Sequence, residues 1–304
     1  MTQIQTHRLV QLIVNGKAGR MAASESRDEL EASIKAIYPE ANTTFTTEGM
    51  DVNKLVREAI QRGSTLIIAG GGDGTVNAVA SAVAGTDTIL GVLPLGTLNH
   101  FSKDLGIPME LKAAIGNLGS GRAIAVDVGE VNGHIFVNNS GLGLYPTIVR
   151  LREERQARGE SKWIAAGVAA ARALRHYQRL TLQVTASGKK LLRKTSIVFL
   201  GNNEYTMEGL NMGTRTQLDA GLLCLYITGE TSSLKLIGLT LSALMGKLQK
   251  NRDYDKILAD EVWIRSRQSI LNVSIDGEVI RLASPLHYRI RPKALWVLVP
   301  DEER

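Results

Sequence analysis

The chain of 304 residues has a formal net charge of +6, from 36 Lys and Arg against 30 Asp and Glu, and 44% of its residues are hydrophobic. This composition predicts an ordinary globular protein with two domains or one large one. The lone cysteine, Cys224, excludes an internal disulfide and a cysteine-rich metal centre, and it favours a location in the reducing cytoplasm. The apolar run at 236–246 is too short to span a bilayer, and the N-terminus lacks a signal-peptide pattern.

Strand and helix patterns alternate over the first 120 residues. Apolar runs predict buried strands at 8–14, 43–47, 65–69 and 88–94. Helices are predicted at 24–38, 51–62 and 75–84, with helical pieces to about residue 118. This alternation predicts a parallel, doubly wound sheet with its ligand crevice at the carboxyl ends of the strands. The loops at 15–19, 70–75 and 94–99 each follow a strand and open on that edge.

The pattern changes after about residue 122. Asn-Gly at 132–133 and Ser-Gly at 187–188 each separate two strand patterns, which is typical of β-hairpins. Further strand patterns follow, interrupted by helices expected near 161–176 and 232–250. We therefore expect an α/β protein with an N-terminal, doubly wound nucleotide-binding domain over 1–122. A C-terminal β-rich, sandwich-like domain is expected over 123–304, with a cleft between the two domains.

The glycine loop in TLIIAGGGDGTVNAVA (65–80) indicates a phosphate site. It lacks the third glycine of the dinucleotide fingerprint and the lysine of the P-loop. Amide groups at a helix N-terminus bind anions, and glycines let a phosphate come close. Asp73 fits beside a phosphate if a divalent cation lies between them, or if it orients a metal-bound water. The alternative is an Asp-Gly turn and helix cap, which does not account for the three preceding glycines.

Two further loops have small residues after a strand. In LPLGTLNHF (93–101), Thr97 and Asn99 are candidates for contacts to phosphate or ribose, although the Pro and Gly of this loop alone indicate only a turn. In VNGKAG (14–19), Lys17 is either a phosphate contact or a surface lysine.

An acid–base group is expected from the second domain, because an acceptor must be positioned across the cleft. NVSIDGEVIRL (272–282) contains the acidic pair Asp276 and Glu278 around a glycine. By itself this stretch is typical of an Asp-Gly hairpin turn.

A basic segment over 150–179 contains eight Lys or Arg against three Glu, so its local charge is 8 − 3 = +5. Such a segment can serve nucleic acid, anionic lipid or an acidic substrate, or it can be a solvated helical face.

GGGDGTVN (70–77), followed by PLGTLNHFSKDLGIP (94–108), resembles the diacylglycerol kinase catalytic-domain family, whose members include bacterial lipid kinases and the sphingosine and ceramide kinases. The motifs VNGKAG, SGLGLYPTIV, GNNEY, TQLDAGLLCLYI and IDGE follow the family's order, so the resemblance covers nearly the whole chain.

The resemblance implies an ATP-dependent kinase that phosphorylates a lipid hydroxyl, diacylglycerol-like or sphingoid-like, with Mg²⁺. The residues that it assigns to nucleotide binding are Asn15, Thr46, Gly71, Gly72, Asp73, Gly74, Thr75, Asn77, Thr97 and Asn99. Asp73 would hold the catalytic Mg²⁺ through the nucleotide. The pair Asp276 and Glu278 would contain the general base, with Glu278 as the first choice.

Three positions depart from the family pattern. Ala78 stands where many members have Glu, and His100 stands where Asp commonly follows GT-x-N. Ala220 replaces an Asp that helps bind a structural Mg²⁺ in relatives, so Asp219 would have to serve instead by a register shift.

Two alternatives stay open from the sequence. NAD kinases and phosphofructokinases also carry GGDGT, so the acceptor could be a soluble molecule such as NAD. The three departures would also suit a non-catalytic regulator that binds nucleotide or lipid. We expect a cytoplasmic protein that associates peripherally with anionic membranes through the basic segment, without a nucleic-acid partner. The oligomeric state, with a homodimer among the options, is left open.

Overall fold

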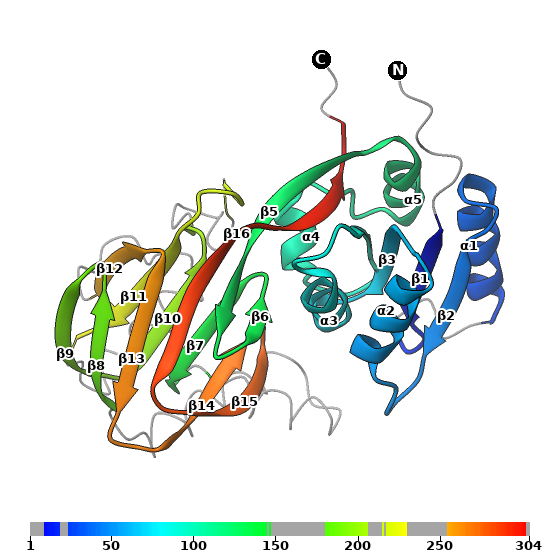
Figure 1. Cartoon of the computed structure of the whole chain (residues 1–304). Helices are drawn as coiled ribbons and strands as arrows, with labels where there is room; N and C mark the ends of the chain where they lie inside the picture. The colour runs from blue at the N-terminus through cyan, green and yellow to red at the C-terminus, as the bar shows by residue number, and fades with distance from the viewer. Residues whose placement is uncertain are drawn as a thin grey trace. The chain divides into compact units, whose positions relative to one another are not determined.

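The computed structural model describes residues 9–18, 24–144, 146, 180–205, 215, 217–229 and 254–301 (Figure 1). The chain divides into two compact units, which are treated separately below. Unit 1 consists of Met1–Val128 and Lys293–Arg304, and unit 2 consists of Gly129–Pro292.

The centre of unit 1 is a parallel sheet in the order β2-β1-β3-β4. Its strands are β1 (Val10–Asn15), β2 (Asn42–Thr46), β3 (Leu66–Gly71) and β4 (Ile89–Pro94). Nearly all residues of β1, β3 and β4 are buried, because helices cover both faces of a doubly wound sheet.

The described helices that accompany this sheet are α1 (Ser24–Ile37), α2 (Val52–Gln61), α3 (Asp73–Val83), α4 (His100–Asp104) and α5 (Leu111–Ser120). The Asp51 side chain caps α2 by accepting from the Lys54 amide, and Glu110 caps α5 in the same way. Helix α2 packs on α3, whereas α1 packs on α5. The predicted parallel, doubly wound sheet is therefore confirmed, and α3 begins at Asp73, two residues earlier than the predicted helix.

Unit 2 is built from antiparallel strands in two sheets. Its strands are the C-terminal end of β5 (Arg122–Val131), β6 (His134–Phe136), β7 (Asn139–Gly143), β8 (Leu180–Ala186), β9 (Lys189–Thr195), β10 (Ile197–Asn202), β11 (Leu223–Thr228), β12 (Tyr254–Ala259), β13 (Glu261–Ser266), β14 (Ile270–Ile275), β15 (Glu278–Ala283) and part of β16 (Leu286–Val299). One sheet has the order β16-β13-β8-β9, with β5 on β16, and the other has the order β12-β11-β10-β7-β14-β15. Apolar side chains from both sheets form one core, as predicted for a sandwich-like domain.

The last strand, β16, contributes to both units. Its N-terminal part pairs antiparallel with β13, and Trp296 and Val297 pair in parallel with β4. Residues 293–304 thus belong to unit 1, whereas the boundaries expected from the sequence, 1–122 and 123–304, are two consecutive pieces. This return of the chain depends on pairing between positions about 200 residues apart, which no local pattern reveals.

Three two-residue hairpin turns have positive φ at both positions, as type I′ turns require. They are Asn132-Gly133, Ser187-Gly188 and Asp276-Gly277, with φ of 47° and 87°, 48° and 72°, and 48° and 94°. The predicted Asn-Gly and Ser-Gly hairpins correspond to β5–β6 and β8–β9.

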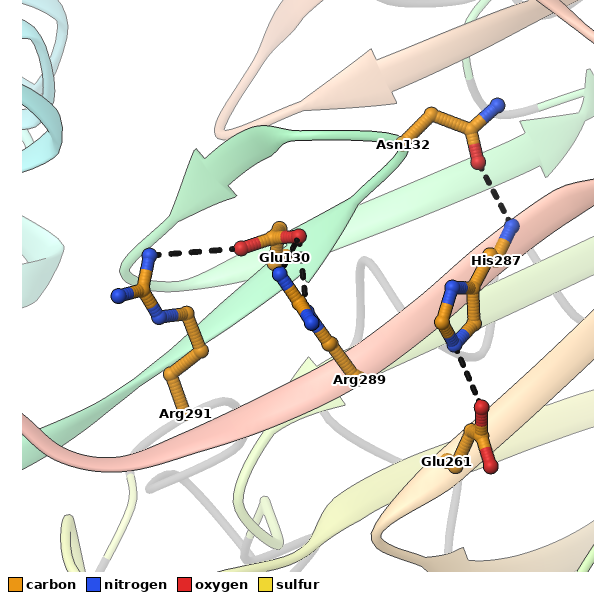
Figure 2. A network of polar contacts seen from close by, with 6 residues as sticks. All are labelled: Glu130, Asn132, Glu261, His287, Arg289 and Arg291. Atoms are coloured by element: carbon orange, nitrogen blue, oxygen red, sulfur yellow. Dashed lines mark hydrogen bonds and ion pairs between the residues drawn. The ribbon is translucent and has the colours of Figure 1, made fainter.

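A polar network joins β5 to β16 (Figure 2). The buried Glu130 carboxylate is 2.7 Å from a terminal guanidinium nitrogen of Arg289 and 3.4 Å from one of Arg291. The backbone amide of His287 donates to Asn132 Oδ1 at 2.7 Å, and the Asn132 amide donates back to the His287 carbonyl at 3.1 Å. Together these contacts attach the β5–β6 hairpin to β16.

The basic segment at 150–179 and the helices expected near 161–176 and 232–250 lie outside the described residues. Within the described ranges, the structure contains no helix with the length and hydropathy of a membrane span.

Candidate active site

The candidate nucleotide site lies at the carboxyl ends of the parallel strands in unit 1. Asn15 at the end of β1 pairs with Thr46 at the end of β2, and Gly71 at the end of β3 pairs with Pro94 at the end of β4. From β1 the chain passes to β2 on one side, and from β3 it passes to β4 on the other. The strand order therefore has its switch point between β1 and β3, where doubly wound sheets bind ligands.

The glycine loop joins β3 to α3. A Cβ on Gly71 would lie 2.6 Å from the Thr75 side chain, so this position accepts only glycine without rearrangement. Gly72 is the N-cap of α3 and has no side chain with which to cap the helix. The first intrahelical bond runs from the Val76 amide to the Gly72 carbonyl, so the preceding amide groups can serve an anion.

The second loop touches the first through glycine backbones. A Cβ on Gly96 would lie 2.4 Å from the Gly72 Cα atom, and the Leu95 amide donates to the Gly71 carbonyl at 2.9 Å. The Asn99 side chain hydrogen-bonds to both backbone groups of Gly96. Its Oδ1 accepts from the Gly96 amide at 3.1 Å, and its Nδ2 donates to the Gly96 carbonyl at 2.9 Å. The structure thus gives Asn99 a role in shaping the loop, whereas its contact to phosphate or ribose stays a prediction.

Asp73 is the first residue of α3 and is half-buried. Its Oδ1 accepts a hydrogen bond of 2.7 Å from the backbone amide of His100, the first residue of α4. Within the described part of the chain, the Oδ2 atom has no such partner and can face a cation. Since the backbone of His100 makes the contact, the departure from the family pattern at this position leaves it intact.

Asn77 lies one helical turn after Asp73 on α3, and therefore on the same helical face. Its side chain is only 8% exposed, and neither Oδ1 nor Nδ2 has a hydrogen-bond partner among the described residues. A buried amide without partners costs about 1–3 kcal/mol, which a bound ligand can recover. Gly74 and Thr97 are exposed at the same two loops.

The first loop, 15–18, is held by its neighbours. Asn15 Oδ1 accepts from the Lys17 amide at 2.9 Å, and the Gly16 amide donates to the Thr46 carbonyl at 3.1 Å. Arg27 of α1 donates to the Gly16 carbonyl at 2.9 Å. The Lys17 ammonium forms an exposed ion pair with Glu48, which lowers the pKa of that carboxyl. Of the two interpretations of Lys17, the structure favours a surface lysine.

In unit 2, Asp276 occupies the hairpin turn between β14 and β15 with a φ of 48°. Its carboxylate accepts three backbone hydrogen bonds, from the amides of Val137 at 2.8 Å, Asn138 at 2.8 Å and Asn139 at 2.9 Å. Burial raises the pKa of Asp276 to about 6, against the opposing effects of these amides and of Arg215. The carboxylate therefore anchors the Val137–Asn139 segment to the turn.

Glu278 differs from Asp276 in its exposure and in its hydrogen bonding, which both bear on whether it can act as a base. It is the first residue of β15 and is exposed. Among the described residues, its carboxylate has no hydrogen-bond or ion-pair partner. Of the two predicted candidates, only Glu278 thus has a carboxylate free to accept a proton from a substrate.

Arg215 was not identified from the sequence, although it lies beside this turn. Its guanidinium donates to the carbonyls of Val137 and Asn202, at 2.6 and 3.0 Å, and to Asn138 Oδ1 at 3.0 Å. No sequence signal indicates it, because its partners are 13 to 78 residues away. Asp219 is exposed, and the described residues contain no group of three or more His, Cys, Asp or Glu suited to a metal ion.

A parallel sheet with two touching glycine loops at the carboxyl ends of neighbouring strands is typical of a class of protein that binds nucleotide phosphates. The family model for the diacylglycerol kinase catalytic domain matches residues 10–131, and the model for the YegS C-terminal NAD kinase β-sandwich-like domain matches residues 149–299. Together the two models span most of the chain, which belongs to the diacylglycerol kinase catalytic-domain family, as the sequence resemblance indicated.

Relatives match over nearly their whole length. A protein of Pseudomonas syringae pv. syringae named "Probable lipid kinase YegS-like" is 29% identical, over 98% of this chain and 95% of its own. A crystal structure of a candidate diacylglycerol kinase from Bacillus anthracis has a TM-score of 0.78 at 24% identity, covering 97% of this chain and 99% of that one. A yeast NADH kinase complexed with NADH has a TM-score of 0.54 at 13% identity, covering 98% and 85%. The two structures show a shared fold.

Replacing Gly96 with Ala should weaken ATP binding about tenfold, because overpacking costs about 1–3 kcal/mol and the two loops must separate to admit the methyl group. Titration calorimetry with ATP measures the affinity. Gly116→Ala in α5 is the matched control, since a Cβ there meets no atom within 4 Å. Equal affinity in the two variants would contradict a phosphate site formed by the touching loops.

Asp276→Asn should remove a pH-dependent part of the stability. Because burial raises the pKa of Asp276 from 3.8 to about 6, the native state binds more protons than the unfolded chain between these values. The contribution of this group is therefore complete below about pH 4 and is lost as the pH rises through about 6.

We expect the difference in unfolding free energy between the parent protein and Asp276→Asn to shrink by on the order of 1–2 kcal/mol from about pH 4 to about pH 7. Denaturant unfolding at several pH values measures it, with the exposed Asp219→Asn as the control for a lost charge. A difference that stays constant with pH would show that burial does not govern the titration of Asp276.

Proposed function

We propose that this protein transfers the γ-phosphate of ATP to the hydroxyl group of a lipid, of a diacylglycerol-like or sphingoid-like kind. The observation that carries the proposal is the pair of glycine loops after β3 and β4, which touch at Gly72 and Gly96. Next to them lie the carboxylate of Asp73 and the unpartnered amide of Asn77. Membership of the lipid kinase family supports the same chemistry.

The residues of the glycine loop fit a nucleotide that carries Mg²⁺. This ion keeps most of its water ligands and binds through one or two carboxylates together with substrate phosphates. A single carboxylate with one free oxygen, as in Asp73, suits that arrangement better than a preformed cage of acidic residues would. The ion would neutralise charge on the phosphates, while the amides of the first turn of α3 hold them.

Glu278 is the general base in this proposal. Phosphoryl transfer requires positioning and charge stabilisation more than covalent help, and one carboxylate suffices to accept the proton of the attacking hydroxyl. Asp276 would support Glu278 indirectly, since it fixes the turn from which β15 begins. The structural Mg²⁺ site at Asp219 is not part of the proposal, because in the described ranges Asp219 belongs to no group of three or more His, Cys, Asp or Glu suited to a metal ion.

The class of acceptor is inferred from the relatives, and the location of the protein is inferred from the acceptor. The names of curated relatives state that they are lipid kinases, and we extend this acceptor class to the present chain. A lipid acceptor requires access to a membrane surface, so we retain the expectation of a cytoplasmic protein that binds anionic membranes peripherally.

An acceptor panel tests the proposal. Purified protein with ATP and Mg²⁺ should phosphorylate at least one of diacylglycerol, sphingosine, ceramide or phosphatidylglycerol, supplied in mixed micelles, and leave NAD unmodified. Mass spectrometry of the products identifies the acceptor. Phosphorylated NAD without a phospholipid product would replace the proposal with a soluble-acceptor kinase, and ATP binding without any product would favour a non-catalytic regulator.

Two conservative variants should separate the chemical roles. Asp73→Asn keeps an oxygen for the His100 amide but loses the charge, so turnover should fall about 10²–10³-fold with the melting temperature retained. Glu278→Gln should lower kcat by about 10²–10⁴-fold with little change in the KM for ATP. The exposed Asp260→Asn of unit 2 is the control for both. Turnover equal to that of the control in either variant would refute the role of that residue.

A further inference from the structure

A hollow with both polar and apolar lining lies on the outer face of unit 2. It measures about 220 Å³ and is lined by Gln183, Thr185, Lys190, Trp263, Arg265 and Pro285. On β8 and β13 these outward residues alternate with core residues such as Val184 and Ile264, as the pleat of a strand requires. The volume is below the ~300–1,000 Å³ of pockets for drug-sized ligands, so the hollow suits a compact group.

The strand register assembles the hollow from two rows of side chains. Trp263 lies opposite Thr185, which lies opposite Lys190, across β13, β8 and β9. Arg265 lies opposite Gln183 two positions further along, and so on the same face. One cation, on β13, and the other, on β9, therefore lie on opposite sides of the two neutral hydrogen-bonding side chains of β8.

The charge of the hollow is uncompensated. Among the described residues, no acidic side chain lines it, and neither Lys190 nor Arg265 has a hydrogen-bond or ion-pair partner there. Two cations, an amide and a hydroxyl around one compact space are the groups that bind a phosphate.

The wall formed by Trp263 is fixed in place. Its ring stacks on that of His287 with centroids 3.9 Å apart and an interplanar angle of 6°. Glu261 Oε1 accepts from Trp263 Nε1 at 3.0 Å and lies 2.6 Å from His287 Nε2, a pair that Figure 2 shows beside the Glu130 network. The Glu261 carboxylate thus holds the indole and the imidazole in place.

Apolar surface surrounds the cations. Trp263 is 40% exposed, and Leu192, opposite Gln183 on β9, is 72% exposed. Indole rings with one polar edge are favoured at the boundary between lipid and water, and basic side chains beside them are attracted to anionic leaflets. A soluble anion would bind to the cations but would leave the leucine and the indole in water.

We propose that this hollow binds the phosphate of an anionic phospholipid headgroup and docks unit 2 on the membrane surface, with Trp263 and Leu192 at the level of the headgroups. Lys190 and Arg265 would bind the phosphate oxygens, and Gln183 and Thr185 would donate to the remaining ones. The inference rests on the proposed function in one respect, which is that a lipid acceptor brings the enzyme to a membrane.

Vesicle sedimentation without ATP tests the docking independently of catalysis. The protein should bind phosphatidylcholine vesicles that contain phosphatidylglycerol more tightly than pure phosphatidylcholine vesicles. Lys190→Gln and Arg265→Gln should each weaken this binding about fivefold, as expected for one basic residue near an anionic surface.

The matched controls are Lys189→Gln and Arg281→Gln, which remove the same charges from exposed positions that do not line the hollow. They should keep the parent affinity. Equal losses in the controls and in the Lys190 and Arg265 variants would overturn the proposal, because the attraction would then follow net charge alone.

Tryptophan fluorescence locates the contact. A variant with Trp163→Phe and Trp296→Phe retains Trp263 as its one tryptophan. Vesicles with brominated acyl chains should quench this tryptophan, whereas inorganic phosphate alone should not produce that quenching. Absence of quenching by vesicles that do bind the protein would overturn the proposed site, and saturable binding of inorganic phosphate without vesicle binding would assign the hollow to a soluble anion instead.

The kinase assay in mixed micelles keeps the two hypotheses apart. Loss of vesicle binding in Lys190→Gln with micellar turnover retained supports both the docking site and the proposed function. Specific vesicle binding by a protein that phosphorylates no lipid would leave the docking site supported and the proposed function refuted.

Discussion

The contact between the backbones of Gly72 and Gly96 is the constraint on which the nucleotide site depends. The two loops follow neighbouring parallel strands and can approach this closely only because Gly96 has no Cβ at the contact. The approach aligns the N-terminus of α3 with the turn before α4, and Asp73 then accepts from the His100 amide. One close contact between main chains therefore positions both the amide groups and the carboxylate of the site.

The acidic turn of unit 2 shows how one hairpin divides two carboxylates between two roles. A type I′ turn puts Asp276 in a left-handed conformation, and its carboxylate binds three successive amides. Glu278 begins the next strand and stays exposed. The hairpin interpretation and the functional interpretation of this stretch are thus compatible, because the turn itself is what presents Glu278.

The charged side chains of unit 2 differ in whether they have partners within the fold. The buried Glu130 pairs with Arg289 and Arg291, and Glu261 contacts Trp263 and His287, so these two carboxylates are used within the fold. The cations at the hollow have no such partner among the described residues. An unpaired charge at the surface costs little free energy of folding, because water solvates it. It is therefore available to a ligand of opposite charge.

The sequence by itself determined the parallel sheet, the hairpin turns and the phosphate loop, because each follows from local periodicity or from glycine and asparagine at defined positions. It also indicated the family, through two glycine motifs a fixed distance apart. Only the tertiary structure decided that Asn99 brackets Gly96, that Asp276 binds main-chain amides, and that β16 returns to the first sheet. Contacts between residues far apart in the chain depend on packing and strand register, and these are set by the whole core rather than by any single segment.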